Sequence, residues 1–182
     1  IKIAKGECPH IKAHLDKMGA FITSSNAPYG LHRPREDRYF ENPKLICKGM
    51  FLSPEFCFDD EKYYVGFSFS VIIQKDKEYD LKYLLGLLNS SFGESWFNAN
   101  GKKRGVGVDI GVAVFRNFPI CKADSAQQKQ IIFLVDKMLL SQKQLHAAEE
   151  NSNEWEHLKS EIEKIDKKID DWLETPASRI IF

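Results

Sequence analysis

The stretch PYGLHRPREDRYFENPKLICK, residues 28–48, is the part of the sequence around which the rest of the chain is organised. Half of the six arginines of the chain fall within six positions of this stretch, between tyrosines: Arg33, Arg35 and Arg38. The planar fork of arginine matches phosphate oxygens and the O6/N7 edge of guanine, so an arginine cluster beside aromatic residues fits a nucleic-acid surface. The alternative is a solvated loop in which nearby acidic residues pair with the arginines: Glu36, Asp37 and Glu41.

Strand-like patterns follow from Lys44 onward. Three short runs, LIC, EFCF and YYVGFSFSVII, are rich in aromatic and β-branched residues and are separated by turn residues. In the longest run, large apolar residues alternate with small ones: Val65, Phe67, Phe69 and Val71. This alternation predicts a long strand with one buried face. A short helix is predicted upstream, from Pro9 to Met18, because proline suits the first turn and Gly19 follows as a stop.

Downstream of the strands, Asp80 is predicted to cap a single helix with a long apolar stripe: Leu81, Leu84, Leu85, Leu88, Phe92 and Trp96. The sequence GKKRGVGVDIG, residues 101–111, then predicts a turn that projects three cations between Gly101 and Gly105: Lys102, Lys103 and Arg104. Such a tip can approach a phosphate backbone closely, or it can be a flexible solvated loop. Strand character resumes over residues 108–120.

The last third of the chain is helical in pattern. Asp124 and Gln127 predict a capping box, and two apolar repeats at heptad spacing, separated by a polar break at residues 151–153, predict an antiparallel helical hairpin. The apolar stripe of the first helix is wider than a two-stranded seam, so this helix is expected to pack on a further element. The predicted fold is α+β. A mostly antiparallel β domain with packed helices, residues 1–122, precedes a two-helix coiled-coil hairpin, residues 123–182.

Composition restricts the class of protein. No apolar run approaches the roughly twenty residues of a membrane span, and the start IKIAKGECPH lacks a secretory signal pattern. The four cysteines are scattered without metal-ligand spacing, which favours buried thiols in the reducing cytoplasm: Cys8, Cys47, Cys57 and Cys121. Because the chain does not begin with methionine, we expect it to be a fragment of a longer protein.

Charge is divided unevenly although the chain is neutral overall. Residues 1–122 hold 18 Lys and Arg against 14 Asp and Glu, net +4, whereas residues 123–182 hold 8 against 12, net −4. An anionic partner is therefore expected to meet the first part.

Motifs for catalysis are weak. Asn26-Ala27-Pro28-Tyr29 departs from the Asn-Pro-Pro-Tyr motif of amino-group DNA methyltransferases at its second position, and Gly105-x-Gly107 misses the spacing of a dinucleotide site. Asp60-Glu61-Lys62 matches half of a nuclease metal site but is explained more simply as a turn. The sequence indicates no third ligand that could complete a metal site with His10 and His14. We therefore expect no catalytic, cofactor-binding or metal-binding residue in this chain.

Five segments in register resemble one known family, the TaqI-like C-terminal specificity domain, over residues 9–122. They are YGLHRPR (29–35), FENPKLI (40–46), FDDEKYY (58–64), LKYLLGLLNS (81–90) and NFPI (117–120). Such domains follow the catalytic domain of adenine-specific DNA methyltransferases and type IIG restriction-modification enzymes. The helical hairpin resembles the coiled coil that follows target recognition domains in type IIG enzymes and type I specificity subunits, although its WLETPASRIIF end differs from the usual tyrosine-rich close.

The resemblance implies a division of labour. An upstream methyltransferase domain, absent from this chain, would bind S-adenosylmethionine and methylate an adenine turned out of the duplex, while this domain would grip double-stranded DNA and read neighbouring bases. We assign backbone contacts first to Lys102, Lys103 and Arg104 and second to Lys44 and Lys48. The family keeps HRPR across enzymes with different targets, so Arg33, Arg35 and Arg38 are expected to fix the fold or grip phosphate. Base-reading residues are expected in Gly49–Phe56 or Asn98–Asn100.

Two other hypotheses stay open. The first is a protein-interaction module in which the heptad hairpin mediates dimerisation or docking. The second is a nuclease that uses Asp60 and Lys62.

Overall fold

The computed structural model describes residues 5–21, 29, 35–53, 55–75 and 77–175. Close contacts divide the chain into two units, residues 1–38 and 39–182. The predicted boundary between a domain of residues 1–122 and a helical hairpin of residues 123–182 stays a prediction. Within the described ranges, no helix combines the length and the apolar character that crossing a membrane requires.

The first unit contains the predicted N-terminal helix. Helix α1 spans Pro9–Lys17 and is followed by a short 3-10 helix, η1, at Gly19–Phe21, which confirms the predicted helix to within one residue. The exposed ammonium of Lys12 pairs with Asp16 one turn later at 2.8 Å. The hydroxyl of Tyr29 also donates to the Asp16 carboxylate.

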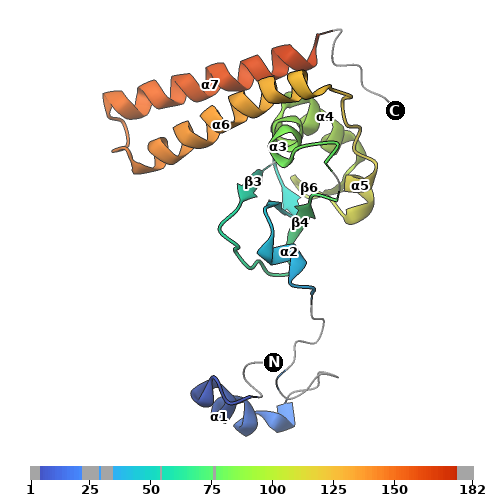
Figure 1. Cartoon of the computed structure of the whole chain (residues 1–182), viewed down its shortest axis with the longest axis vertical. Helices are drawn as coiled ribbons and strands as arrows, with labels where there is room; N and C mark the ends of the chain where they lie inside the picture. The colour runs from blue at the N-terminus through green and yellow to red at the C-terminus, as the bar shows by residue number, and fades with distance from the viewer. Residues whose placement is uncertain (1–4, 22–28, 30–34, 54, 76, 176–182) are drawn as a thin grey trace. The chain divides into compact units, whose positions relative to one another are not determined.

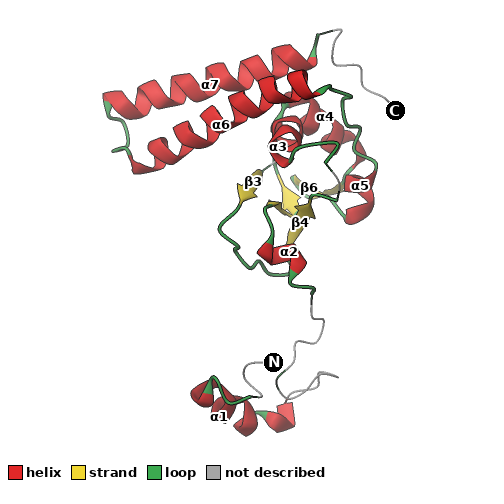
Figure 2. Cartoon of the chain, viewed as in Figure 1, coloured by secondary structure: helices red, strands yellow, loops and turns green. Residues whose placement is uncertain are grey.

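The centre of the second unit is an antiparallel sheet in the order β3-β1-β4. Its members are β1 (Lys44–Lys48), β3 (Phe56–Asp59) and β4 (Phe69–Ile73). Strand β1 is central, and the first four of its residues are buried because neighbours cover both edges and both faces. Figure 1 shows this region between the helices, and Figure 2 shows how short its strands are.

A second sheet, in the order β2-β6-β5, continues from the first through Gly49. Its strands are β2 (Met50–Phe51), β5 (Lys102–Arg104) and β6 (Gly107–Asp109). The Gly49 N–H donates to the Ser68 carbonyl at 2.8 Å, and the Gly49 carbonyl accepts from the Ile110 N–H at 3.0 Å. A Cβ at residue 49 would lie 3.2 Å from the Ser68 oxygen, so glycine allows the two sheets to meet here.

The predicted long strand over residues 63–73 is wrong in its first half, because only Phe69–Ile73 forms a strand. The Asp59 carboxylate accepts the backbone N–H groups of Glu61 at 2.9 Å and Tyr63 at 3.0 Å, which commits this backbone to a turn. Phe67 lies in a second turn and is 92% exposed, so it does not belong to a buried strand face.

The predicted single helix from Leu81 is two helices, α3 (Leu81–Asn89) and α4 (Ser91–Asn100). The predicted cap is confirmed, since the Asp80 side chain accepts from the Lys82 N–H at 2.7 Å. The break comes at Ser90, whose Oγ accepts from the Gly93 N–H at 3.2 Å and donates to the Leu87 carbonyl at 2.7 Å. Serine thereby ends one helix and caps the next, which the continuous apolar stripe did not reveal.

The predicted strand over residues 108–120 is also wrong beyond its start. Strand β6 ends at Asp109, and Val112–Arg116 forms helix α5. Strand β2 offers partners only for Val108 and Asp109, so the chain beyond them has no strand to pair with. Local apolar composition therefore did not determine the structure here.

The two C-terminal helices, α6 (Ser125–Ala147) and α7 (Asn153–Leu173), lie side by side as the predicted hairpin (Figure 1). The predicted capping box of Asp124 and Gln127 is confirmed. Helix α6 also packs on α3, where a Cβ at Gly86 would lie only 2.8 Å from the Ile131 side chain. This second contact confirms that α6 packs on more than its partner helix, and the α+β class with antiparallel sheets is confirmed as well.

A cluster of aromatic rings joins these elements. Phe97 of α4 is fully buried, and its ring centroid lies 5.2–5.9 Å from those of five other aromatic residues: Phe51, Phe56, Trp96, Phe115 and Phe118. These rings come from both sheets, from α4, and from α5 with the segment after it. The four cysteines are free thiols, but only Cys47 and Cys121 are buried as predicted, whereas Cys8 is half-buried and Cys57 is exposed. Burial raises the pKa of Cys47 to about 12.

Candidate nucleic-acid interface

The predicted basic turn is a short β-hairpin formed by β5 and β6. Arg104 pairs with Gly107, which leaves Gly105 and Val106 as a two-residue loop. Gly105 has φ +59° while Val106 does not adopt a positive φ, which is the pattern of a tight hairpin turn with glycine at its first central position. The side chain of Val106, at the tip, is 93% exposed.

The hairpin is held closely against helix α4. Gly101, between α4 and β5, donates its N–H to the Phe97 carbonyl at 2.8 Å. A Cβ at Gly101 would lie 2.2 Å from the Val108 side chain, so the hairpin could not come this close with any other residue at 101. This packing favours a fixed ribbon over the flexible loop that was the alternative interpretation of the sequence.

Strand alternation divides the three cations between two faces. Lys102 pairs in register with Asp109, whereas Lys103 pairs with the buried Val108. Because side chains alternate along a strand, Lys102 and Arg104 share the outer face with Asp109, and Lys103 lies on the other face. Lys103 Nζ accordingly approaches Asn98 Oδ1 of α4 at 3.4 Å. All three cations are exposed, but only two of them point the same way.

Two of the exposed cations that were predicted within residues 39–182 have acidic partners. Arg104 Nε donates to Asp109 Oδ2 at 2.7 Å, with 55% and 35% of the two side chains exposed. Lys48 pairs with Glu55, and both are more than half exposed. For Lys102, no ion pair is present within the described residues. Exposed ion pairs of this kind contribute little to folding, and both cations stay at the surface.

The two segments predicted to hold base-reading residues both flank this hairpin. Strand β2, within Gly49–Phe56, pairs with β6, and Met50 lies opposite Asp109 on the outer face with 54% of its surface exposed. Asn98 and Asn100 belong to the last turns of α4, which lead directly into β5. The structure therefore brings both segments next to the hairpin, since residues 50–51 pair with β6 and residues 98–100 lead into β5.

Lys44 is a correction to the predicted set. Its side chain is completely buried, where it pairs with Asp59 across the first sheet, and Nζ also donates to the Phe40 carbonyl at 2.8 Å. A buried ammonium with two protein partners cannot reach a phosphate. The pair instead links β1, β3 and the short helix α2 (Arg38–Glu41), and Asp59 in turn holds the following turn.

The same pair predicts an acid-sensitive contribution to stability. Burial by itself raises the pKa of Asp59, but the hydrogen bonds from Lys44 and from the N–H groups of Glu61 and Tyr63 outweigh it, so the pKa lies below its ordinary value. A carboxyl whose pKa is lower in the folded state stabilises the fold above its unfolded pKa of about 3.9, and this contribution disappears as pH falls toward the folded pKa.

We therefore expect unfolding free energy, measured by urea denaturation from pH 5 to pH 2.5, to fall more steeply below pH 3.9 in the wild type than in Asp59→Asn. The extra slope is at most about 1.4 kcal/mol per pH unit, the value for one proton. Equal slopes in the two proteins would show that the Asp59 carboxyl has no such role.

The arginine cluster is only partly described. Arg33 lies outside the described residues, Arg35 is exposed, and Arg38 Nε pairs with Glu36 Oε2 at 2.8 Å. The pairing of Arg38 agrees with the alternative interpretation of this stretch. Arg35 and Arg38 belong to the unit of residues 1–38, and the hairpin belongs to the other unit.

The Asp60-Lys62 segment is the turn that the sequence suggested. Lys62 has φ +65° and pairs with Glu41 at 3.4 Å, while Tyr64 stacks on Phe40 with ring centroids 4.5 Å apart. Among the described residues, no group of three or more potential metal ligands converges. No geometry supports a metal-dependent nuclease in this part of the chain.

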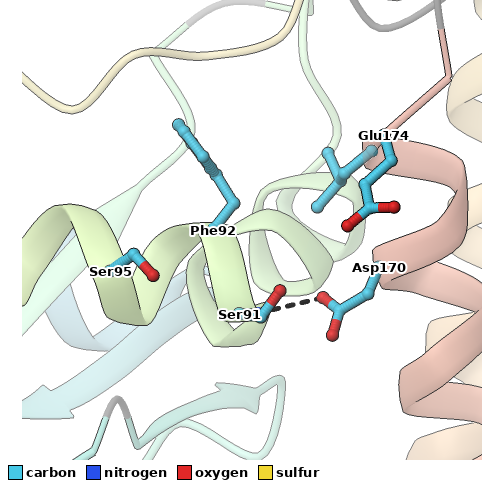
Figure 3. A pocket seen from close by; sticks show the side chains of 6 residues that line it. Ser91, Phe92, Ser95, Asp170 and Glu174 are labelled. Carbon is cyan, nitrogen blue, oxygen red and sulfur yellow. Dashed lines mark hydrogen bonds between the residues drawn. The ribbon is translucent and has the colours of Figure 1, made fainter.

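A cavity of about 260 Å³ lies between the start of α4 and the end of α7 (Figure 3). Its lining is largely acidic or apolar, and Asp170 accepts the Ser91 N–H at 2.9 Å, which occupies the amino end of α4. It lies among helices α4 and α7 rather than among the cations of the hairpin.

Sequence reasoning missed Asp109. This residue lies five positions after Arg104, and in a loop this spacing would not indicate a contact. Once residues 105 and 106 form a two-residue turn, the two side chains lie on the same face of the hairpin and form an ion pair. The signal was present, since glycine followed by one residue between two short runs is a hairpin pattern.

The family model of the TaqI-like C-terminal specificity domain matches residues 10–120, which is more than half of the chain. No curated protein matches. The matched region includes both sheets, the basic hairpin and helices α3 to α5, and it ends just before the helical hairpin. The chain belongs to the family of TaqI-like C-terminal specificity domains.

Proposed function

We propose that this chain recognises a short sequence in double-stranded DNA as the specificity part of a restriction-modification enzyme. The observation that carries the proposal is the exposed edge strand β5 of the second sheet, which bears Lys102, Lys103 and Arg104 and is held with β6 on α4. Strands of a sheet can enter a groove of B-DNA, and cations on such an edge strand can contact phosphates and base edges.

Membership of a specificity-domain family supports the same proposal, because such a domain selects a site while another domain carries out the reaction. We accordingly place methyl transfer from S-adenosylmethionine to adenine, and any cleavage activity, in a methyltransferase domain upstream of this chain. The proposed DNA-binding residues here are Lys102, Lys103, Arg104 and Lys48, with Arg33, Arg35 and Arg38 as phosphate contacts of the first unit. Lys44 is excluded by its burial.

The proposal predicts sequence-selective binding that depends on salt. The full 182-residue chain is used, because a chain ending at residue 122 would lack Ile131 and Val135, which pack against α3. We expect each wrong base pair in the preferred duplex to weaken binding by about 1–3 kcal/mol. Changing Lys102, Lys103 and Arg104 together to Gln should reduce the slope of log K against log salt by up to about 2.7, at about 0.9 for each lost phosphate contact. Fluorescence anisotropy in a salt series measures both quantities.

A matched control removes the same charge elsewhere. Changing Lys164, Lys167 and Lys168 of α7 to Gln also deletes three exposed cations, but it should leave affinity and salt slope unchanged. Equal effects of the two triple variants would show that only net charge matters and would contradict the proposed surface. A chain that binds no duplex and self-associates in sedimentation would instead support the protein-interaction module, to which the exposed Phe133 and Leu140 of α6 could contribute.

A further inference from the structure

We infer that Arg104, oriented by Asp109, reads a guanine in the target site, whereas Lys102 beside it grips the DNA backbone. This inference rests on the proposed function and assigns different roles to two cations on the same face of the hairpin. It also names Asp109, an acidic residue, as part of the DNA-recognition surface, where it acts as a positioning residue.

The geometry of the ion pair leaves the reading edge of the arginine available. The contact to Asp109 Oδ2 is made by Nε of Arg104, at 2.7 Å. Guanidinium carries five N–H donors in a rigid planar fork, so the two terminal nitrogens still offer one donor each on the end of the fork. A pair of parallel donors is what the O6 and N7 acceptors of guanine require.

The neighbouring carboxylate favours a base over a phosphate as the partner of this arginine. A phosphate arriving at Arg104 would bring a negative charge close to the charge of Asp109, and this repulsion reduces the gain. The acceptors of guanine belong to a neutral group, so they avoid most of the repulsion. Lys102 has no ion pair within the described residues and keeps its full charge for a phosphate.

A contribution to folding stability does not explain the Arg104–Asp109 pair. Both side chains are substantially exposed, and exposed ion pairs contribute little to folding. Their effect is to hold a long side chain in one orientation on a hairpin that is itself held by α4 through Gly101. An arginine already oriented in the free protein loses less conformational freedom when it binds.

The decisive experiment separates charge from the shape of the fork. The preferred duplex is first selected with the full wild-type chain from a pool randomised at its centre, and affinities are then measured for all four base pairs at each position. We expect one position at which the wild type prefers guanine by about 5- to 150-fold. Arg104→Lys should lose this preference while keeping the salt slope, because lysine keeps the charge but not the paired donors. Lys102→Gln should weaken all duplexes alike and lower the salt slope by about 1.

Replacement of that guanine by 7-deazaguanine tests the contact atom by atom. Removal of N7 should weaken binding of the wild type about tenfold or more and leave binding of Arg104→Ala unchanged, whereas 7-deazaguanine at another position serves as the control. Asp109→Asn should bind mixed-sequence DNA at least as tightly as the wild type but show a smaller guanine preference. A merely structural role of Asp109 would leave that preference unaltered, and thermal melting of the variant would confirm that it folds.

The outcomes distinguish this inference from the proposed function. A wild-type chain with no preference for any duplex overturns both. A wild-type preference that survives in Arg104→Lys, or that is insensitive to 7-deazaguanine at every position, overturns the guanine-reading role of Arg104 alone. A uniform loss of affinity in Arg104→Ala with every base preference intact would assign Arg104 to the backbone instead.

Discussion

Replacing Lys44 by Met should lower the free energy of unfolding by about 3–5 kcal/mol, the cost of leaving one charge of a buried pair without its partner. Methionine keeps most of the apolar stem of lysine but removes the ammonium that pairs with Asp59 and donates to the Phe40 carbonyl. The Asp59 carboxylate would remain buried at the end of β3 without a counter-charge. Urea denaturation followed by tryptophan fluorescence measures the loss, since all three tryptophans lie within residues 39–182.

The matched control is Lys48→Met, four residues later on the same strand. Lys48 also pairs with an acidic residue, but that pair is more than half exposed and its loss should cost at most about 1 kcal/mol. Adding Asp59→Asn to Lys44→Met should recover part of the loss, because a neutral amide is cheaper to bury and can still accept one backbone N–H. Equal destabilisation by Lys44→Met and Lys48→Met would contradict the buried pair.

Replacing Phe97 by Ala should cost about 3–5 kcal/mol, the usual penalty for removing a buried aromatic ring and leaving a cavity. Phe97 is fully buried and contacts rings from both sheets and from α5, so no single element can move to fill the space. Chemical denaturation gives the magnitude. The variant should also weaken DNA binding at temperatures where it stays folded, because the cavity would loosen the end of α4, where the carbonyl of residue 97 accepts the Gly101 N–H at the base of the hairpin.

Phe133→Ala provides the comparison for that variant. Phe133 lies on the outer side of α6 with 58% of its surface exposed, so its removal should change stability by no more than about 0.5 kcal/mol. If the two phenylalanine variants are equally stable, the aromatic cluster is not the centre of the core.

Helices were the part of the fold that local sequence specified well. The side chains of Asp80 and Asp124 accept hydrogen bonds from backbone N–H groups within three residues, so these helix starts depend on contacts that the sequence itself displays. The exception is Ser90, where the apolar stripe continues through a real break. An apolar stripe indicates which side of a helix is buried, but it does not indicate whether the helix is continuous.

Strand lengths could not be predicted in the same way, because a strand needs a partner. Residues 63–68 and 112–116 have strand-like composition, yet the first segment follows a turn held by Asp59 and the second lies beyond the end of β2. The first outcome depends on side-chain hydrogen bonds of a neighbouring residue, and the second depends on the extent of another strand. Composition alone indicates a preference for strand, and these contacts outweigh that preference.

Local sequence was sufficient for the α+β class, the starts of α3 and α6, the helical hairpin and the position of the basic segment at residues 102–104, because each depends on side chains within a few positions of one another. Which cations are available depends on contacts that form in the folded chain. The tertiary structure buried Lys44 on a central strand, placed Lys102 and Arg104 on one face and Lys103 on the other, and brought Asp109 against Arg104. The physical reason is that exposure and pairing of a charge depend on strand register and on neighbouring elements, and both are set by contacts between distant parts of the chain.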